Sequence, residues 1–239
     1  MVSFLIARLS RCAGPVRDRA RHRRHSMAVQ IAIAYHSGYG HTEALARAVH
    51  DGAGREPGAI ARMIDVSEMS EADWALLNAA DAIIFGSPTY MGAVSGPFKT
   101  FMDATSRIWL DRGWQDKVAA GFTVSSSQAG DKFATLSQLS TLAAQHGMIW
   151  VSLGLLPGNN SSTGSVEDIN RIGASIGVMA QANGDQGGDV APPQSDRRTA
   201  ALLGARVAEI AGRLKVGGQV ALIDDAPEGQ ADLSTSVPA

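Results

Sequence analysis

Cysteine is almost absent from this 239-residue chain, since Cys12 is the only one. A lone cysteine excludes an internal disulfide framework and any multi-cysteine metal site. The six histidines, at positions 22, 25, 36, 41, 50 and 146, lack the spacing of a zinc site, so we predict no bound metal. Apolar runs of 18 residues or more are also missing, and we therefore predict no stable membrane insertion.

Basic residues are scarce beyond position 26. Residues 1–26 hold seven of the 21 Lys and Arg residues but only one of the 23 acidic residues. The remainder therefore carries 14 basic and 22 acidic residues, a net charge of −8, which argues against a nucleic-acid partner. The 45% apolar and 18% charged fractions are typical of a soluble globular protein, and we predict a cytoplasmic location.

The two ends of the chain lack the pattern of a folded domain. Residues 1–26 are either a transit peptide, typically rich in arginine and poor in acids, or sequence upstream of a true start at Met27, and we favour the second interpretation. Residues 216–239 contain four acids, no Lys or Arg, and scattered Gly, Pro and Ser, a composition that predicts a disordered tail. We predict one folded domain over residues 27–215.

Between these ends, short apolar runs alternate with helical periodicity. Strands are predicted at 29–35, 60–66, 81–86, 118–124 and 148–153. Helices are predicted at 42–54, 71–79, 98–109, 131–146 and 203–214. This alternation indicates an α/β fold whose parallel sheet has helices on both faces. In such a sheet a ligand binds outside the carboxyl ends of the strands, so the loops there are the candidate site.

The loop after the first strand has the composition of a phosphate-binding turn. Hydroxyls and glycines allow close approach of an anion, and the next helix adds unpaired N–H groups. The loop contains no Lys or Arg and matches neither the Walker nor the dinucleotide glycine pattern, which favours a flavin monophosphate over a nucleoside triphosphate. An ordinary turn with an N-cap is the alternative. The candidate residues are Ser37, Gly38, Tyr39, Gly40, His41 and Thr42.

The loop after the third strand has the sequence Gly-Ser-Pro-Thr-Tyr-Met-Gly over residues 86–92. We expect Pro88 to fix a turn beside Thr89, and Tyr90 and Met91 to pack on an isoalloxazine ring. A surface turn with a solvated tyrosine is the alternative.

Two segments, residues 81–90 and 99–103, closely resemble the flavodoxin-like flavin reductases, in particular the WrbA-type NAD(P)H:quinone oxidoreductases and their FMN-reductase relatives. The similarity extends from about residue 30 to residue 214. It implies a flavodoxin-like three-layer fold with a five-stranded parallel sheet of order 2-1-3-4-5. It also implies FMN as cofactor and NAD(P)H as co-substrate.

The resemblance assigns further residues. The loop after the fourth strand, which touches the flavin ring in this family, corresponds here to Ser125, Ser126, Ser127 and Gly130. His146, in a His-Gly-Met motif, matches a histidine that approaches the flavin from a neighbouring subunit. By itself it would be a cap at a helix C-terminus. Trp109 matches the tryptophan beside the substrate pocket, although its helical spacing equally fits a core position.

The function implied is two-electron transfer from NAD(P)H to a quinone or similar small acceptor by a ping-pong mechanism. The chemistry belongs to the cofactor, so we predict no catalytic side chain. An electron carrier without an acceptor pocket is the main alternative, and a fold that has lost its flavin is another. Because the stretch 67–80 is short where the quinone reductases carry an insertion, we predict a homodimer or a homotetramer. The long connection 154–195 is expected to border the flavin.

Overall fold

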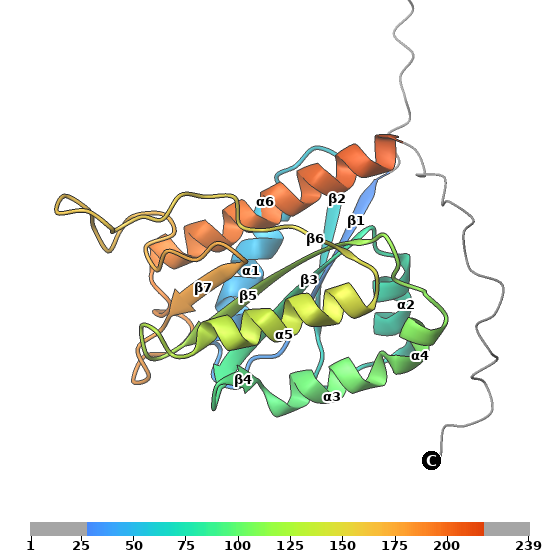
Figure 1. The fold of residues 1–239 in the computed structure, drawn as a ribbon, viewed down its shortest axis with the longest axis horizontal. Coiled ribbons are helices and arrows are strands. Elements are labelled where there is room, and N and C mark those ends of the chain that lie inside the picture. Colours follow the sequence, from blue (N-terminus) through green and yellow to red (C-terminus); the bar gives the residue numbers. More distant parts are fainter. Residues whose placement is uncertain (1–27, 218–239) are drawn as a thin grey trace, which may run out of the picture.

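The computed structural model describes residues 28–217, whose strands form one twisted sheet (Figure 1). The parallel strands are β1 (Val29–Tyr35), β2 (Ala59–Asp65), β3 (Ala82–Tyr90), β5 (Val118–Ser125), β6 (Ile149–Trp150) and β7 (Val178–Gln181). Their order is β2-β1-β3-β5-β6, with β7 also paired to β5. With β6 and β7 taken as the fifth strand, this is the predicted order. The predictions for residues 1–26 and 218–239 lie outside the described residues.

Helices cover both faces of this sheet, as predicted. Ile31 and Ile33 of β1 face one core, which α1 (His41–Ala53) and α6 (Gln194–Gly217) cover. Ala32 and Ala34 face the other core, together with side chains of α2 (Glu71–Ala79), α3 (Gly96–Ala104) and α5 (Lys132–Gln145). Because both faces are buried, the strands are continuous apolar runs rather than alternating ones. The flavodoxin-like three-layer fold is confirmed.

The third strand is longer than predicted. It continues through Pro88 to Tyr90 and then turns into the short antiparallel strand β4 (Ala93–Val94). Met91 and Gly92 form the two-residue turn, with φ of +49° and +77°. Two successive positive φ values are typical of tight β-hairpins. The turn expected at Pro88 therefore lies three residues later, since this proline pairs with Val124 at the end of β5.

Two other predicted elements are interrupted. The helix predicted over 98–109 divides at Thr105 into α3 and α4 (Ser106–Leu110). The predicted fifth strand is split: β6 pairs with the start of β5, and β7, far along the chain, pairs with its end. The intervening residues, rich in Gly, Ser and Asn, extend away from the sheet (Figure 1). The final helix begins earlier than predicted, at Gln194, and includes residues 216 and 217 of the predicted tail.

Within residues 28–217, no helix combines the length and the apolarity needed to cross a membrane.

Candidate functional site

The carboxyl ends of the three central strands meet at one edge of the sheet. Tyr35 of β1 lies beside Gly86 of β3, and Pro88 of β3 lies beside Val124 of β5. The loops that follow these strands therefore come together, although the strands end at residues 35, 90 and 125. This confirms that the predicted loops share one edge of the sheet.

The loop after β1 is a cradle of unpaired donors. None of the backbone N–H groups from Ser37 to Thr42 donates a hydrogen bond to another group within residues 28–217. Gly40 has φ +85° and ends the loop at the N-terminus of α1, where the helix dipole is positive. The Ser37 Oγ accepts from the Glu43 N–H at 3.1 Å, which leaves its own proton for a ligand. Consecutive free N–H groups at a helix start form an anion-binding concavity.

Tyr90 lies over this cradle. A Cβ on Gly38 would lie 2.5 Å from the Tyr90 hydroxyl, so only glycine leaves room for the tyrosine there. The rings of Tyr39 and Tyr90 meet edge to face, 6.1 Å between centroids. Burial, with a smaller effect of Tyr39, raises the pKa of Tyr90, which keeps its hydroxyl neutral. Tyr39 and Met91 are exposed beside it. Aromatic and apolar side chains therefore border the anion cradle.

Polar side chains at the end of β3 form hydrogen bonds with other residues of the protein. The buried Thr89 Oγ1 lies 2.8 Å from both the Thr123 Oγ1 and the Thr135 Oγ1. The Ser95 N–H donates to the Ser87 Oγ at 3.0 Å. The hydroxyl of Thr89, a residue predicted to bind the cofactor, joins β3 to β5 and α5. These bonds make the edge rigid.

The loop after β5 closes around a lysine that the sequence analysis missed. Lys132, the first residue of α5, is 1% exposed, and its ammonium donates to three oxygens of residues 125–128. Ser126 and Ser127 remain exposed, in agreement with a ligand-facing loop. A lysine at the start of a helix, directly after a serine-rich loop, was the available signal, because a cation there opposes the helix dipole.

The end of the long connection lies against the cradle. The His41 Nε2 is 2.6 Å from the Gln186 carbonyl oxygen, and a Cβ on Gly188 would lie 2.5 Å from the Gly40 carbonyl oxygen. Further along, the Gln181 side chain donates to the Ser126 carbonyl at 2.9 Å. The connection therefore contacts both the first loop and the loop after β5. This agrees with the expectation that it borders the site.

Two predicted site residues lie at the opposite edge of the sheet. His146 follows α5 directly, just before β6, and is only 5% exposed. Its Nε2 is 2.9 Å from the Thr105 Oγ1, and its ring packs 4.7 Å from that of Trp114. Trp109, one helical turn beyond Thr105, is 52% exposed. It is not a core residue, and Trp114 takes that place. Neither predicted residue reaches the cradle of its own chain.

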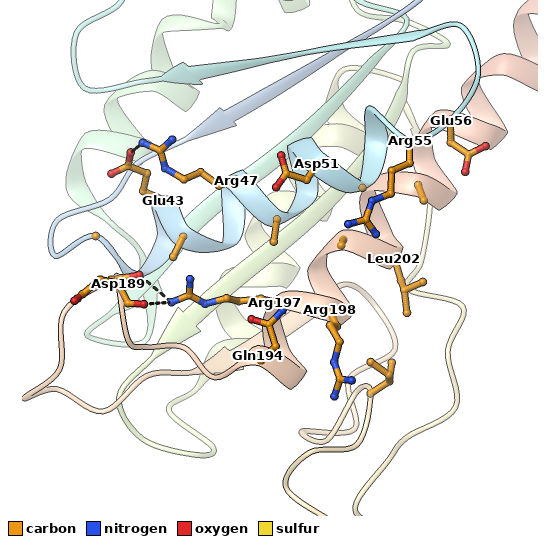
Figure 2. Close-up of a pocket in the computed structure, with 18 residues that line it drawn as sticks. Glu43, Arg47, Asp51, Arg55, Glu56, Asp189, Gln194, Arg197, Arg198 and Leu202 are labelled. Carbon is orange, nitrogen blue, oxygen red and sulfur yellow. Dashed lines mark hydrogen bonds and ion pairs between the residues drawn. The ribbon is translucent and has the colours of Figure 1, made fainter.

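A groove of about 1000 Å³ runs between α1 and the first turns of α6 (Figure 2). It touches the cradle only at Gly40. Arginines and acids alternate along its walls, and Arg197 is engaged by the carbonyls of Gly188 and Asp189. Apolar side chains, including Ile169 and Leu202, also line this groove. The charged side chains are Glu43, Arg47, Asp51, Arg55, Glu56, Asp189, Arg197 and Arg198.

Comparison with known proteins shows the family to which this chain belongs. Residues 27–160 match the family described as NADPH-dependent FMN reductase. The chain belongs to this family. Flavodoxin FldP of Pseudomonas aeruginosa is 48% identical over 185 residues, which cover 77% of this chain and 98% of that protein. An NAD(P)H dehydrogenase (quinone) of Archaeoglobus fulgidus is 35% identical, with 77% and 98% covered.

A similar solved structure adds support. The flavodoxin, WrbA-like protein from Agrobacterium tumefaciens has 44% sequence identity and a TM-score of 0.62, with 78% of this chain and 99% of that chain covered. The resemblance drawn from residues 81–90 and 99–103 is thereby confirmed. So are the predicted cofactor, FMN, and the predicted co-substrate, NAD(P)H.

The described residues fit FMN. The free N–H groups of residues 37–42 suit a phosphate, and the absence of Lys and Arg from that loop suits a group held by neutral donors. Tyr90 and Met91, at the neighbouring end of β3, offer apolar surface to a planar ring. A ligand with one phosphate and one planar ring matches this combination.

Proposed function

We propose that this chain is an FMN-dependent oxidoreductase that transfers two electrons from NAD(P)H to a quinone or a similar small acceptor. One observation carries the proposal: unpaired N–H groups of residues 37–42 lie beside an exposed tyrosine and methionine, at the carboxyl edge of the sheet. The phosphate would be held by Ser37 to Thr42. The ring would lie beside residues 88–91, with Ser125, Ser126, Ser127 and Gly130 along its polar edge.

Bound FMN supplies the redox chemistry, because it accepts two electrons from a nicotinamide and gives them to an acceptor. The protein's part is binding, orientation and electrostatics. The exposed surface around Tyr39, Tyr90 and Met91 leaves one open side to the site. Nicotinamide and acceptor would therefore occupy that side in turn, which is a ping-pong cycle. No side chain has to act as an acid or a base.

Trp109 would contribute from a second copy of the chain. It is half-exposed at the edge opposite the cradle, so it would line the substrate pocket of a neighbouring subunit in a homodimer or homotetramer. His146 would need to leave its buried position beside Thr105 to contact a neighbour's flavin. We place the enzyme in the cytoplasm, with no nucleic-acid partner, consistent with a net charge of −8 beyond residue 26.

A second function is supported by one comparison. The relative with 48% identity is named a flavodoxin, and flavodoxins are electron carriers. A carrier docks to a redox protein and needs no pocket for a small acceptor. The same cradle would then hold FMN, but NAD(P)H would not be oxidised at a useful rate.

Steady-state kinetics separate these functions. FMN-loaded protein is mixed with NADH or NADPH and a soluble benzoquinone, and nicotinamide absorbance is followed. We expect sustained oxidation with parallel double-reciprocal plots, as a ping-pong cycle requires. Almost no oxidation by FMN-saturated protein would favour the carrier. Protein that takes up no FMN would contradict both functions. Ser37→Ala, which removes a cradle hydroxyl, should raise the Kd for FMN roughly tenfold.

A further inference from the structure

The side chain of Lys132 is buried under the loop after β5, with all of its protons used. The Nζ donates to the Ser125 Oγ at 2.8 Å and to the carbonyl oxygens of Ser127 and Gln128, each at 2.7 Å. A buried ammonium is costly unless every proton has an acceptor. The first turn of a helix is also an unfavourable place for a cation. The burial of Lys132 is therefore tied to this particular arrangement of oxygens.

The loop in turn is shaped to surround the ammonium. Gly130 and Asp131 have φ of +52° and +54°, which bends the chain back on itself before α5 begins. A Cβ on Gly130 would lie 2.1 Å from the Ser125 Oγ, so the turn is as tight as the backbone allows. Without the lysine, the Gln128 carbonyl would lose its partner, and the Ser127 carbonyl would keep only the bond from the Ser125 hydroxyl, at 3.0 Å. The shape of the loop and the charge beneath it depend on each other.

The ammonium of Lys132 lies at the carboxyl edge of the sheet, which the proposed function assigns to FMN. Residues 123 and 124 of β5 pair with Ser87 and Pro88 of β3, so the loop that follows β5 is adjacent to the Tyr90 segment. The Gln181 side chain holds the same loop from the other side, through the Ser126 carbonyl. Lys132 is thus a fixed positive charge immediately behind the surface assigned to the flavin ring.

We propose that Lys132 is a positioning residue for FMN: its ammonium sets the shape of loop 125–130 and places a positive charge behind the ring. This inference rests on the proposed function, which puts the ring beside that loop. A positive charge stabilises the electron-rich reduced ring more than the oxidised ring. Lys132 therefore raises the midpoint potential of bound FMN and tightens binding of the anionic cofactor.

Wild-type protein offers a way to remove the charge without removing the side chain. Burial lowers the pKa of Lys132 to about 8, with Asp196 of α6 opposing this effect and Arg171 of the long connection adding to it. A neutral amine still donates two hydrogen bonds, to the Ser127 and Gln128 carbonyls, while the Ser125 hydroxyl turns to donate to it. The loop keeps its shape as the charge is lost, so pH separates the two roles.

The test compares Lys132→Met with wild type and with a matched control, Lys117→Met. Lys117 is also a partly buried lysine with a pKa lowered by burial, and its Nζ donates to the Asn78 and Ala80 carbonyls at 2.8 and 2.6 Å. It lies at the opposite edge of the sheet, just before β5. The Kd for FMN, by fluorescence quenching, and the midpoint potential of bound FMN are measured from pH 7 to 9.5.

For wild type and Lys117→Met we expect the Kd to rise roughly three- to tenfold across this range, as one nearby charge is lost. In these two proteins the midpoint potential of bound FMN should also fall more steeply with pH than in Lys132→Met, and the curve should have an inflection near pH 8. Lys132→Met should bind FMN more weakly at pH 7 and lack the inflection.

Three outcomes decide the matter. Equal potentials and equal pH profiles in wild type and Lys132→Met would overturn the role of Lys132 while leaving FMN binding intact. If Lys132→Met does not fold, Lys132→Gln takes its place, and a Kd and potential equal to those of wild type at pH 7 overturn the role equally. A wild type that binds no FMN at any pH defeats the proposed function instead.

Discussion

The Nε2 of His146 lies 2.9 Å from the Oγ1 of Thr105, and that hydroxyl donates to the Met102 carbonyl at 2.7 Å. Because the hydroxyl has only one proton, it must accept from the histidine, and the Nε2 therefore carries the hydrogen. The Nδ1 is buried and has no hydrogen-bond partner among residues 28–217. A second proton there would have no acceptor, in agreement with the lowered pKa that burial gives His146.

This arrangement predicts loss of stability in acid. Since the folded-state pKa of His146 lies below the unfolded value of about 6.5, the unfolded chain takes up a proton first as pH falls. The free energy of unfolding should therefore decrease below about pH 6.5. Urea unfolding at pH 7 and pH 5 measures the decrease, and His146→Gln should reduce it.

Burial also lowers the pKa of His36, with Asp65 opposing, so His146→Gln removes only part of the acid sensitivity. His50→Gln, at a half-exposed position of α1, is the control for loss of a surface histidine. An unchanged difference between pH 7 and pH 5 in His146→Gln contradicts the role of the buried Nδ1.

A second prediction concerns Gly38 and the tyrosine over the cradle. Gly38→Ala places a Cβ 2.5 Å from the Tyr90 hydroxyl, which must move, and FMN affinity should fall roughly tenfold. Tyr90→Phe removes that oxygen, and the nearest ring carbons are then 3.5 Å away, an ordinary contact. The double variant should therefore bind FMN about as well as Tyr90→Phe. Fluorescence titration measures all four proteins, and a double variant as weak as Gly38→Ala counts against the contact.

A third prediction concerns the packing of α1 on α6. A Cβ on Gly52 would lie 1.9 Å from the Ala201 carbonyl oxygen, and one on Gly204 would lie 2.0 Å from the Val49 carbonyl oxygen. Each glycine-to-alanine change should lower the free energy of unfolding by about 1–3 kcal/mol or more, because backbone must move. Gly96→Ala, where a Cβ meets nothing within 4 Å, is the control. Denaturant unfolding measures these free energies, and equal losses in all three variants would contradict the predicted clashes.

A fourth prediction concerns the ion pair that anchors the long connection. The Arg171 Nε and Nη2 each lie 2.8 Å from an Asp196 carboxylate oxygen, and the two side chains are 8% and 2% exposed. Arg171→Met leaves Asp196 buried without its partner and should cost about 3–5 kcal/mol of folding free energy.

The exposed Arg107–Asp111 pair is the comparison, and Arg107→Met should cost less than about 1 kcal/mol. Adding Asp196→Asn to Arg171→Met should recover part of the loss, since the buried charge is then gone. Thermal and denaturant unfolding report both effects. Strictly additive losses in the double variant would mean that the pair contributes no coupling.

The local sequence pattern was sufficient to predict the strands and helices whose apolar residues recur at regular spacing. The run 29–35 and the helical stripe after it predicted β1 and α1 to within a residue, and 71–79 matched α2. The alternation predicted a parallel sheet with helices on both faces, because parallel strands require crossovers of fixed hand, and the strand order came from the resemblance to the flavodoxin-like flavin reductases. The sequence also singled out the loop 37–42, whose backbone N–H groups have no partner within residues 28–217. These features depend on neighbours in the chain, which a sequence displays directly.

Contacts between distant residues decided the rest. Spacing does not show which tryptophan is buried: Trp114 packs beside Phe85 and Phe101, whereas Trp109 is half-exposed. Pro88 continues β3 because Val124 is its neighbour, and Lys132 is buried because loop 125–128 turns its oxygens inward. His146 contacts Thr105, 41 residues away. Burial and hydrogen bonding across such separations are properties of the packed chain, and no local pattern encodes them.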